Sequence, residues 1–169
     1  MTRAFVGIGV PDEVSAVLEA AQIGLRQGNL VPFENFHVTL AFLGEQPDLV
    51  LAEVHDALAA LDLPALDLTI RGLGTFGDRR PRALFAEVIP TPGLTALRRK
   101  VRQTARDFGV DLGHERFHPH VTLARFGSGL SEEQVPELQA HIARRMGRVA
   151  GAWRAEAFHL YESRLLAHG

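Results

Sequence analysis

One eight-residue stretch occurs twice in this chain, and this repeat constrains the fold more than any other feature of the sequence. Residues 37–44 read His-Val-Thr-Leu-Ala-Phe-Leu-Gly, and residues 120–127 read His-Val-Thr-Leu-Ala-Arg-Phe-Gly. Each stretch is a short run rich in β-branched and aromatic residues that ends at a glycine, which predicts a strand. We therefore expect two equivalent strands that begin with the same His-x-Thr sequence.

Alternation along a strand places the histidine and the threonine of each copy on one face. Side chains two residues apart project to the same side, so His37 lies beside Thr39 and His120 beside Thr122. The valine and leucine of each copy turn to the opposite face, towards the core. Packing alone gives no reason for the same polar pair in both places, so we interpret the two pairs as functional.

The composition is typical of one globular domain without disulfides. The chain has 169 residues, 46% hydrophobic and 22% charged, which is long enough to bury a substantial core. It contains no cysteine, which excludes disulfides and thiolate metal sites. The net charge of −2 means that any site for a polyanion has to be local. No apolar run is long enough to span a membrane and the N-terminus resembles no signal peptide, so we expect a cytoplasmic protein without membrane attachment.

The order of the predicted elements also repeats. Strands are predicted at 4–10, 36–43, 66–73, 83–89, 117–126 and 149–161. Apolar residues at helical spacing predict helices from residue 12, from residue 48, over 91–108 and after a Ser131–Gln134 capping box. The two pseudo-repeats, about 4–73 and 83–163, each follow the plan strand, helix, His-x-Thr strand, helix, strand. We predict an α+β fold in which residues 1–169 form a single bilobal domain, a duplicated αβ unit with two antiparallel-rich sheets, helices outside and a central cleft.

Pseudo-twofold symmetry between the halves would bring His37 and His120 together in this cleft. A free imidazole has a pKa of about 6.5, so at neutral pH one histidine can act as a base and another as an acid. Such a pair suits displacement at phosphorus, because one imidazole deprotonates the attacking oxygen and the other protonates the leaving oxygen. Thr39 and Thr122 are placed to donate hydrogen bonds to the phosphoryl oxygens.

A histidine-based metal site is the competing interpretation. His114, His118 and His120 lie close together in the sequence, with Glu115 nearby. The residue that accompanies the histidine in both copies is nevertheless threonine, a poor ligand for transition metals. We therefore predict that the site uses no metal and no cofactor.

Longer strings around both copies resemble a known family. They are residues 34–44 (Glu-Asn-Phe-His-Val-Thr-Leu-Ala-Phe-Leu-Gly), 119–125 (Pro-His-Val-Thr-Leu-Ala-Arg) and 160–163 (Leu-Tyr-Glu-Ser). The paired motifs are similar to those of the 2H phosphoesterase superfamily, which is defined by two His-x-Ser/Thr motifs. The fuller strings resemble its bacterial and archaeal branch, the RNA 2′,3′-cyclic phosphodiesterases, also called 2′-5′ RNA ligases. The resemblance covers nearly the whole chain.

This resemblance implies an activity, site residues and partners. The activity would be metal-independent opening of terminal 2′,3′-cyclic phosphates to 2′-phosphates, with reversible 2′-5′ joining of RNA ends. His37 and His120 would be catalytic, and Thr39, Thr122 and Arg125 would bind substrate. The partners would be RNA ends with a 2′,3′-cyclic phosphate, such as tRNA fragments, acted on by a monomer. Two alternatives stay open: a non-catalytic module that binds RNA or a nucleotide, and a related enzyme acting on 2′-5′ oligoadenylates or small cyclic nucleotides.

Strict alternation conflicts with a binding role for Arg125. Counted from His120 and Thr122, Arg125 should point to the opposite face, unless the strand ends or bulges near Ala124. The first copy has Phe42 at the same position. Parity makes Phe42 a core residue, and an aromatic platform for a base is the alternative.

Arg125 also suggests which histidine is the base. A cation beside the second motif favours the neutral form of its histidine. We therefore predict that His120 activates the attacking water and that His37 protonates the leaving oxygen.

Arginines gather in two further places. Arg79, Arg80 and Arg82 lie in a Gly-rich loop over 72–82, where flexible cations can meet a phosphate backbone. A second set lies on the helix that follows Pro92, and its members are Arg98, Arg99, Lys100, Arg102 and Arg106. A basic helix face is most often only solvated, so the loop is the better candidate for binding RNA.

Overall fold

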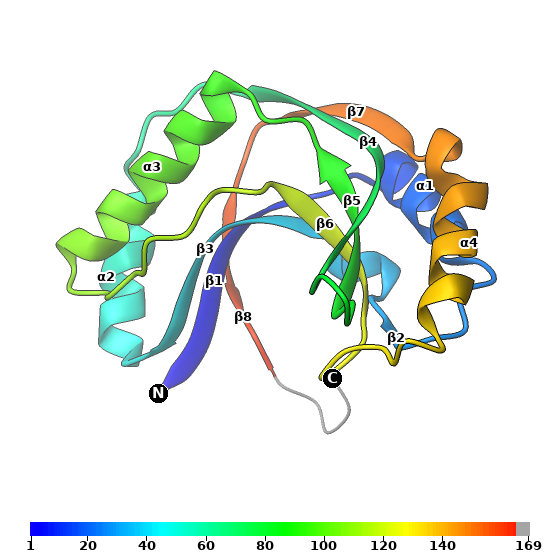
Figure 1. Cartoon of the computed structure of the whole chain (residues 1–169). Helices are drawn as coiled ribbons and strands as arrows, with labels where there is room; N and C mark the ends of the chain where they lie inside the picture. Colours follow the sequence, from blue (N-terminus) through cyan, green and yellow to red (C-terminus); the bar gives the residue numbers. More distant parts are fainter. Residues whose placement is uncertain (165–169) are drawn as a thin grey trace.

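Two curled antiparallel sheets form the frame of the protein in the computed structural model, which describes residues 1–164 (Figure 1). The first sheet has the order β3-β1-β8 and consists of β1 (Thr2–Gly9), β3 (His37–Gln46) and β8 (His159–Glu162). The second has the order β2-β6-β5-β4-β7 and consists of β2 (Asn29–Leu30), β4 (Leu66–Phe76), β5 (Ala83–Val88), β6 (His120–Arg125) and β7 (Ala150–Ala155). The helices are α1 (Asp12–Gln22), α2 (Asp48–Ala59), α3 (Pro92–Asp107) and α4 (Val135–Arg145), with 3-10 turns at Phe33–Asn35 and Met146–Arg148. The predicted α+β class, with antiparallel sheets and outer helices, is confirmed.

The helices begin where local sequence signals place them. Helices α1 and α2 start directly after prolines, and α3 starts after Thr91, whose hydroxyl accepts a hydrogen bond from the N–H of Leu94 at 3.2 Å. The backbone N–H of Ser131 donates to the side-chain oxygen of Gln134 at 3.0 Å, as in a capping box. Helix α4 nevertheless begins only at Val135, after a turn.

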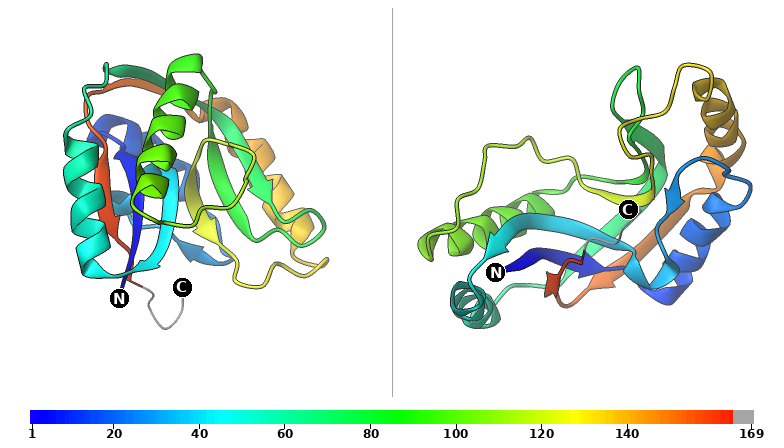
Figure 2. Two further views of the ribbon diagram at one scale, coloured as in Figure 1. Left: turned by 90° about the vertical axis from the view of Figure 1, so that its left-hand side faces the viewer. Right: turned by 90° about the horizontal axis from the view of Figure 1, so that it is seen from below.

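The two lobes do not coincide with the two halves of the sequence. Strand β4 of the first half pairs with β5 of the second half, and β8 of the second half pairs with β1 of the first. The helices are exchanged as well, because α1 contacts β6 and β7 whereas α3 contacts β3 and α2. In Figures 1 and 2, α2 and α3 lie beside the first sheet and α1 and α4 beside the second. Each lobe is therefore built from both halves of the chain.

The single strand predicted at 149–161 is wrong, because this segment forms two strands in different sheets. Strand β7 pairs with β4 in the second sheet, and β8 pairs with β1 in the first. The residues between them, 156–158, carry the chain from one sheet to the other. The predicted strand at 117–126 also begins later, at His120, and residues 28–35, for which no element is predicted, contain β2 and the first 3-10 turn.

Buried apolar side chains from both sheets and all four helices form one connected core. Buried His141 ties α4 to α1, because its Nε2–H donates to the carbonyl of Ala21 at 2.8 Å. In residues 1–164, no helix has both the length and the apolar character needed to cross a membrane.

Candidate active site

The strands that carry the two motifs, β3 and β6, share one irregularity as well as one sequence. In the ladder with β1, the pairing of β3 skips Leu40, and in the ladder with β5 the pairing of β6 skips Leu123. Each skipped residue is a β-bulge placed directly after the threonine. The burial of the first six residues is also the same in both strands, with the histidine and threonine partly exposed and the valine and leucine buried.

The bulge returns the sixth residue of each motif to the face of the histidine. Arg125 therefore lies on the side of His120 and Thr122, which resolves the conflict that strict alternation predicted. By the same shift Phe42 is not a core residue, and that expectation is wrong, because the Phe42 side chain is 62% exposed. Its ring centroid lies 6.1 Å from that of Phe5, and the Phe5 ring in turn lies beside the imidazole of His37.

Both imidazoles are held by the same hydrogen bond. Nδ1 of His37 lies 2.7 Å from the carbonyl oxygen of Asn35, and Nδ1 of His120 lies 2.6 Å from that of His118. A carbonyl oxygen only accepts, so Nδ1 carries the proton in both rings. In the described part of the chain, no hydrogen bond engages either Nε2. Each Nε2 can therefore accept a proton when the ring is neutral and donate one when it is charged.

The hydroxyls of Thr39 and Thr122 are available as well. Both side chains are partly exposed, and neither hydroxyl makes a hydrogen bond to another residue of the described range 1–164. Two imidazole nitrogens and two hydroxyls are thus presented from equivalent positions of two strands.

The two motifs lie within electrostatic reach of one another. Strands β3 and β6 are in contact although they belong to different sheets. Burial is the main cause that lowers the pKa of His37 below its ordinary value, and the charges of Arg125 and His120 lower it further. Burial also lowers the pKa of His120, an effect that the bond to the His118 carbonyl opposes; the charges of His118 and Arg125 lower it further, and Glu87 opposes them. Arg125 therefore acts on both histidines, so the expectation that it singles out His120 is wrong.

Sequence reasoning missed Glu87, which faces the second motif. Glu87 is paired with His120 in the β5–β6 ladder, and its carboxylate lies 3.0 Å from Nε2 of His118. His118 entered the sequence analysis only as a member of a histidine cluster. No local pattern marks Glu87, because it precedes the motif by more than thirty residues and reaches it only through strand pairing.

Aromatic rings line both sides of the site. The ring centroid of Phe5 lies 4.6 Å from that of His37, and Tyr161 stacks on Phe5 at 5.0 Å. On the second side, Phe76 lies 4.8 Å from His120 and Phe85 lies 5.2 Å from it. These rings explain why burial lowers the pKa of both imidazoles.

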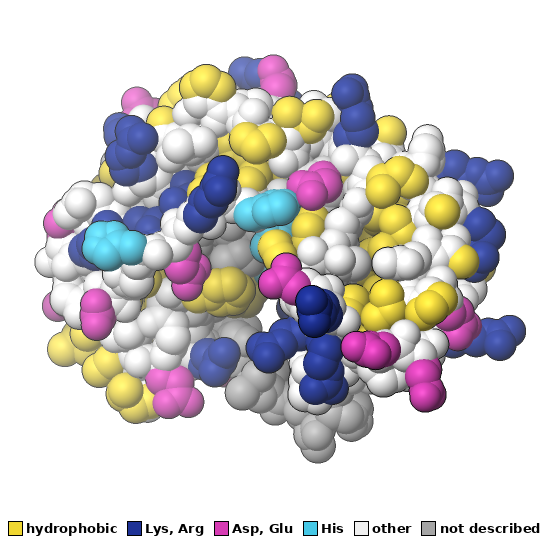
Figure 3. All heavy atoms as spheres, in the orientation of Figure 1, with side chains coloured by type: hydrophobic (Ala, Val, Ile, Leu, Met, Phe, Trp, Pro, Cys, Tyr) yellow, Lys and Arg dark blue, Asp and Glu magenta, His cyan; other side chains and the backbone are white. Residues whose placement is uncertain are grey.

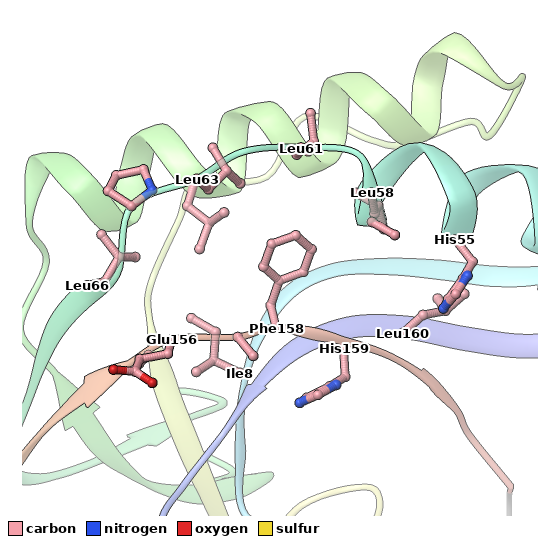
Figure 4. A pocket seen from close by; sticks show the side chains of 15 residues that line it. Ile8, His55, Leu58, Leu61, Leu63, Leu66, Glu156, Phe158, His159 and Leu160 are labelled. Carbon is pink, nitrogen blue, oxygen red and sulfur yellow. The ribbon is translucent and has the colours of Figure 1, made fainter.

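Cations lie near the two motifs. In the space-filling view, histidine side chains lie near the middle of the face, with lysine and arginine side chains to their left and below them (Figure 3). A cavity of about 320 Å³ contains neither motif; Leu58, Leu63, Phe158 and Leu160 are among the residues that line it (Figure 4). The chemistry of the motifs, and not the volume of this cavity, locates the candidate site.

The remaining sequence candidates are the histidine cluster around the second motif and the arginines of the Gly-rich loop. No three His, Asp or Glu side chains of the described residues gather as a metal site would require, so the cluster of His114, His118 and His120 does not form one. The loop arginines Arg79, Arg80 and Arg82 are exposed, and Arg80 reaches the carbonyl of Gly129 at 3.4 Å.

Comparison with known proteins gives consistent matches. A family model described as the 2′-5′ RNA ligase superfamily matches residues 10–165. The RNA 2′,3′-cyclic phosphodiesterase of Aeropyrum pernix is 34% identical over 139 residues, which cover 80% of this chain and 77% of that protein. The Geobacillus stearothermophilus protein of the same name is 32% identical over 149 residues, 83% of this chain, but the match spans only 48% of that relative. A crystal structure of a Thermus thermophilus protein has a TM-score of 0.77 at 28% identity, and the match covers 99% of this chain and 91% of that one.

Proposed function

This chain belongs to the 2′-5′ RNA ligase superfamily, and we propose that it opens 2′,3′-cyclic phosphates at RNA ends to 2′-phosphates. One observation carries the proposal: His37 and His120 both present an unengaged Nε2 beside a threonine hydroxyl, from equivalent positions of two adjoining strands. The relatives named RNA 2′,3′-cyclic phosphodiesterase support the same activity.

The proposed reaction is an in-line displacement at phosphorus. The neutral imidazole takes a proton from water at Nε2, and the water oxygen forms a bond to phosphorus. The bond from phosphorus to the 3′-oxygen breaks, and the second imidazole, protonated at Nε2, gives its proton to that oxygen. The product is a 2′-phosphate with a free 3′-hydroxyl. Thr39, Thr122 and Arg125 stabilise the charge on the phosphoryl oxygens.

We assign the base to His120 and the acid to His37. His118 and Glu87 act on the pKa of His120 and have no counterpart among the influences on His37, and the effect of His118, which lowers the pKa of His120, is the larger of the two. A lower pKa favours the neutral form, which is the form that a base needs.

The same arrangement accounts for joining of RNA ends. If a 5′-hydroxyl takes the place of water, its oxygen bonds to phosphorus as the 3′-oxygen leaves, and a 2′-5′ phosphodiester forms. The exposed ring of Phe42 offers a platform on which a base could stack beside the first motif. We place this activity in a cytoplasmic monomer that acts on RNA fragments such as those of tRNA.

The test is the product of a defined substrate. An oligonucleotide that ends in a 2′,3′-cyclic phosphate is incubated with the protein in excess EDTA, and the product is identified by 31P NMR. We expect a 2′-phosphate at a rate that EDTA does not change, and a rate lower by about 10²–10⁴-fold for H37A and for H120A. A 3′-phosphate would refute the assigned leaving oxygen. Loss of turnover with EDTA and its recovery with zinc or manganese would refute metal independence. Binding of the substrate without turnover would favour the non-catalytic alternative.

A further inference from the structure

Helix α3 and the segment that follows it enclose a second concave surface, the α3 basic pocket, which the proposed reaction does not use. Its cavity is about 260 Å³. Its lining includes four arginines of α3 and two residues of the following segment: Arg98, Arg99, Arg102, Arg106, His114 and Glu115. Four permanent cations thus face one carboxylate.

The positive charge of this pocket is not neutralised within the described residues 1–164. None of the four arginines forms a salt bridge there. Three of them each donate to one backbone carbonyl: Arg98 to Glu115 at 3.0 Å, Arg102 to Gly113, and Arg106 to Leu112 at 3.4 Å. A guanidinium has five N–H donors, so most of the donors remain free.

The pKa of Arg98 also indicates that the positive charge of the pocket is not neutralised by the described residues. Burial lowers the pKa of Arg98 below its ordinary value, and the neighbouring charge of Arg102 lowers it further, while Glu115 opposes the shift. An anion in the pocket would relieve the repulsion and satisfy the free N–H groups.

One stretch of chain, residues 114–119, leads from the pocket to the second motif. The guanidinium of Arg98 lies over the ring of Phe117, 4.6 Å from its centroid. Phe117 and His118 in turn line a neighbouring cavity together with Arg116 and Glu87. A ligand could therefore extend from the α3 basic pocket along residues 114–119 to the motif. In Figure 3, lysine and arginine side chains lie on the left of the face, between its edge and the central histidines.

We propose that the α3 basic pocket binds the phosphate backbone of an RNA chain whose 2′,3′-cyclic end occupies the cleft. This inference rests on the proposed function and gives it a substrate class, oligonucleotides in preference to cyclic mononucleotides. RNA is the ligand that this surface favours, because guanidinium groups match phosphate in a bidentate geometry and the path ends at a site for phosphorus chemistry. From the sequence alone, the 72–82 loop was the better candidate for binding RNA. The structure instead favours the basic surface of α3.

The experiment removes charge from the pocket and gives up one contact to the following segment, the 3.4 Å bond from Arg106 to the carbonyl of Leu112. R99A/R106A leaves Arg98 and Arg102, which hold residues 113–115, in place. R144A/R148A removes the same charge from exposed positions on α4 and the turn after it, outside the pocket. Both variants and the wild type are assayed on a 2′,3′-cyclic mononucleotide and on a 12-mer with a 2′,3′-cyclic end, at several salt concentrations.

We expect R99A/R106A to lower kcat/KM for the 12-mer about tenfold or more at low salt, and to leave kcat/KM for the mononucleotide within about twofold. A plot of log affinity for the 12-mer against log salt concentration should become less steep by roughly 1.4. Each single-strand phosphate contact contributes about 0.7 to this slope, and the variant removes two. R144A/R148A should leave kcat/KM unchanged for both substrates. Equal behaviour of the two double variants, or an equal loss on both substrates, would overturn the proposal while the proposed function stood.

A binding measurement separates failure of this inference from failure of the proposed function. A fluorescent 12-mer that ends in a 3′-hydroxyl is titrated against the three proteins without turnover. Weaker binding by R99A/R106A alone supports the pocket even if no cyclic phosphate is hydrolysed. Unchanged binding, or displacement of the RNA by poly-glutamate of equal charge at the same concentration, would show that the pocket is not an RNA site.

Discussion

The two motifs share their backbone and differ in what faces them. His37 and His120 occupy the same place in their strands, precede the same bulge and donate from Nδ1 to the carbonyl two residues earlier. Across the ladder, however, His37 faces Gly9 and His120 faces Glu87. The shared strand position and the shared Nδ1 hydrogen bond fix the direction of Nε2. The residues across the ladder differ, and they set the charge around each ring.

The residues that supply the two carbonyls differ in the same way. Asn35 is neutral, whereas His118 carries an ionisable ring that pairs with Glu87. A duplicated strand can thus keep one reactive geometry while its neighbours make the two copies chemically unequal, which is what a reaction with one acid and one base needs.

The sixth position of each motif shows a further difference. The first motif has Phe42 there and the second has Arg125, and equivalent bulges turn both to the face of their histidine. Arg125 acts on both histidines, because its charge lowers the pKa of His37 and of His120. It is therefore shared by the pair, and its effect does not distinguish them.

The largest expected effect comes from removing either imidazole. H37A and H120A should each reduce kcat by about 10²–10⁴, the contribution of one acid or base. A substrate with sulfur in place of the 3′-oxygen distinguishes the roles, because a thiolate leaves without protonation. With His37 as the acid, H37A should regain most of its rate on this substrate and H120A should not. Rescue of H120A alone would reverse the assignment, and equal rescue would remove the distinction.

Loss of either threonine hydroxyl should come next. T39A and T122A are expected to lower kcat by about 10²–10³, as removal of one donor to a developing oxyanion does. The serine variants keep the hydroxyl and should retain most of the rate. If alanine and serine variants lost the same activity, the threonine methyl group, and not the hydroxyl, would be the part that matters. Unequal losses at the two sites would show which motif bears more of the phosphoryl charge.

Arg125 should affect affinity and pH dependence together. R125M removes a charged hydrogen bond worth about 1.5–3 kcal/mol, so kcat/KM should fall by about 10–100-fold. Arg125 lowers the pKa of both histidines, so its loss should raise both values and move the acid limb of the kcat/KM profile to higher pH.

The lysine variant serves as the control for charge. R125K keeps the cation but loses the planar fork, so its pH profile should stay near that of the wild type while the rate remains low. An R125M profile that coincides with the wild-type profile would show that Arg125 does not act on the histidines.

The smallest effect should come from making the second motif like the first. H118N places asparagine where the first motif has Asn35 and keeps the backbone carbonyl that holds His120. Removal of the His118 charge should raise the pKa of His120 and leave that of His37 unchanged. NMR titration of the imidazole resonances measures both values. A shift of equal size at both histidines would contradict the separation of the two surroundings.

N35A supplies the matched control for this comparison. It also keeps the backbone carbonyl and removes no charge, so neither histidine should shift. We expect H118N to change kcat by less than about tenfold, since it moves a pKa and removes no reacting group.

Much of the site could be predicted from the sequence because its information is local. His37, Thr39, His120 and Thr122 share faces by the two-residue repeat of a strand. Prolines and Thr91 mark helix starts within one or two residues of those observed. The segment 149–161 was predicted wrongly, because its residues favour strand throughout. It forms two strands because its two ends pair with different sheets.

The sequence by itself determined two His-x-Thr strands, the helices between them and the absence of thiol chemistry, since each of these depends on residue type and short-range spacing. Only the tertiary structure decided that bulges at Leu40 and Leu123 turn Phe42 and Arg125 to the face of the histidines, and that Glu87 faces His120. A bulge and a cross-strand neighbour are properties of a pair of strands. They are settled when distant segments align, and no single segment carries that register in its own sequence.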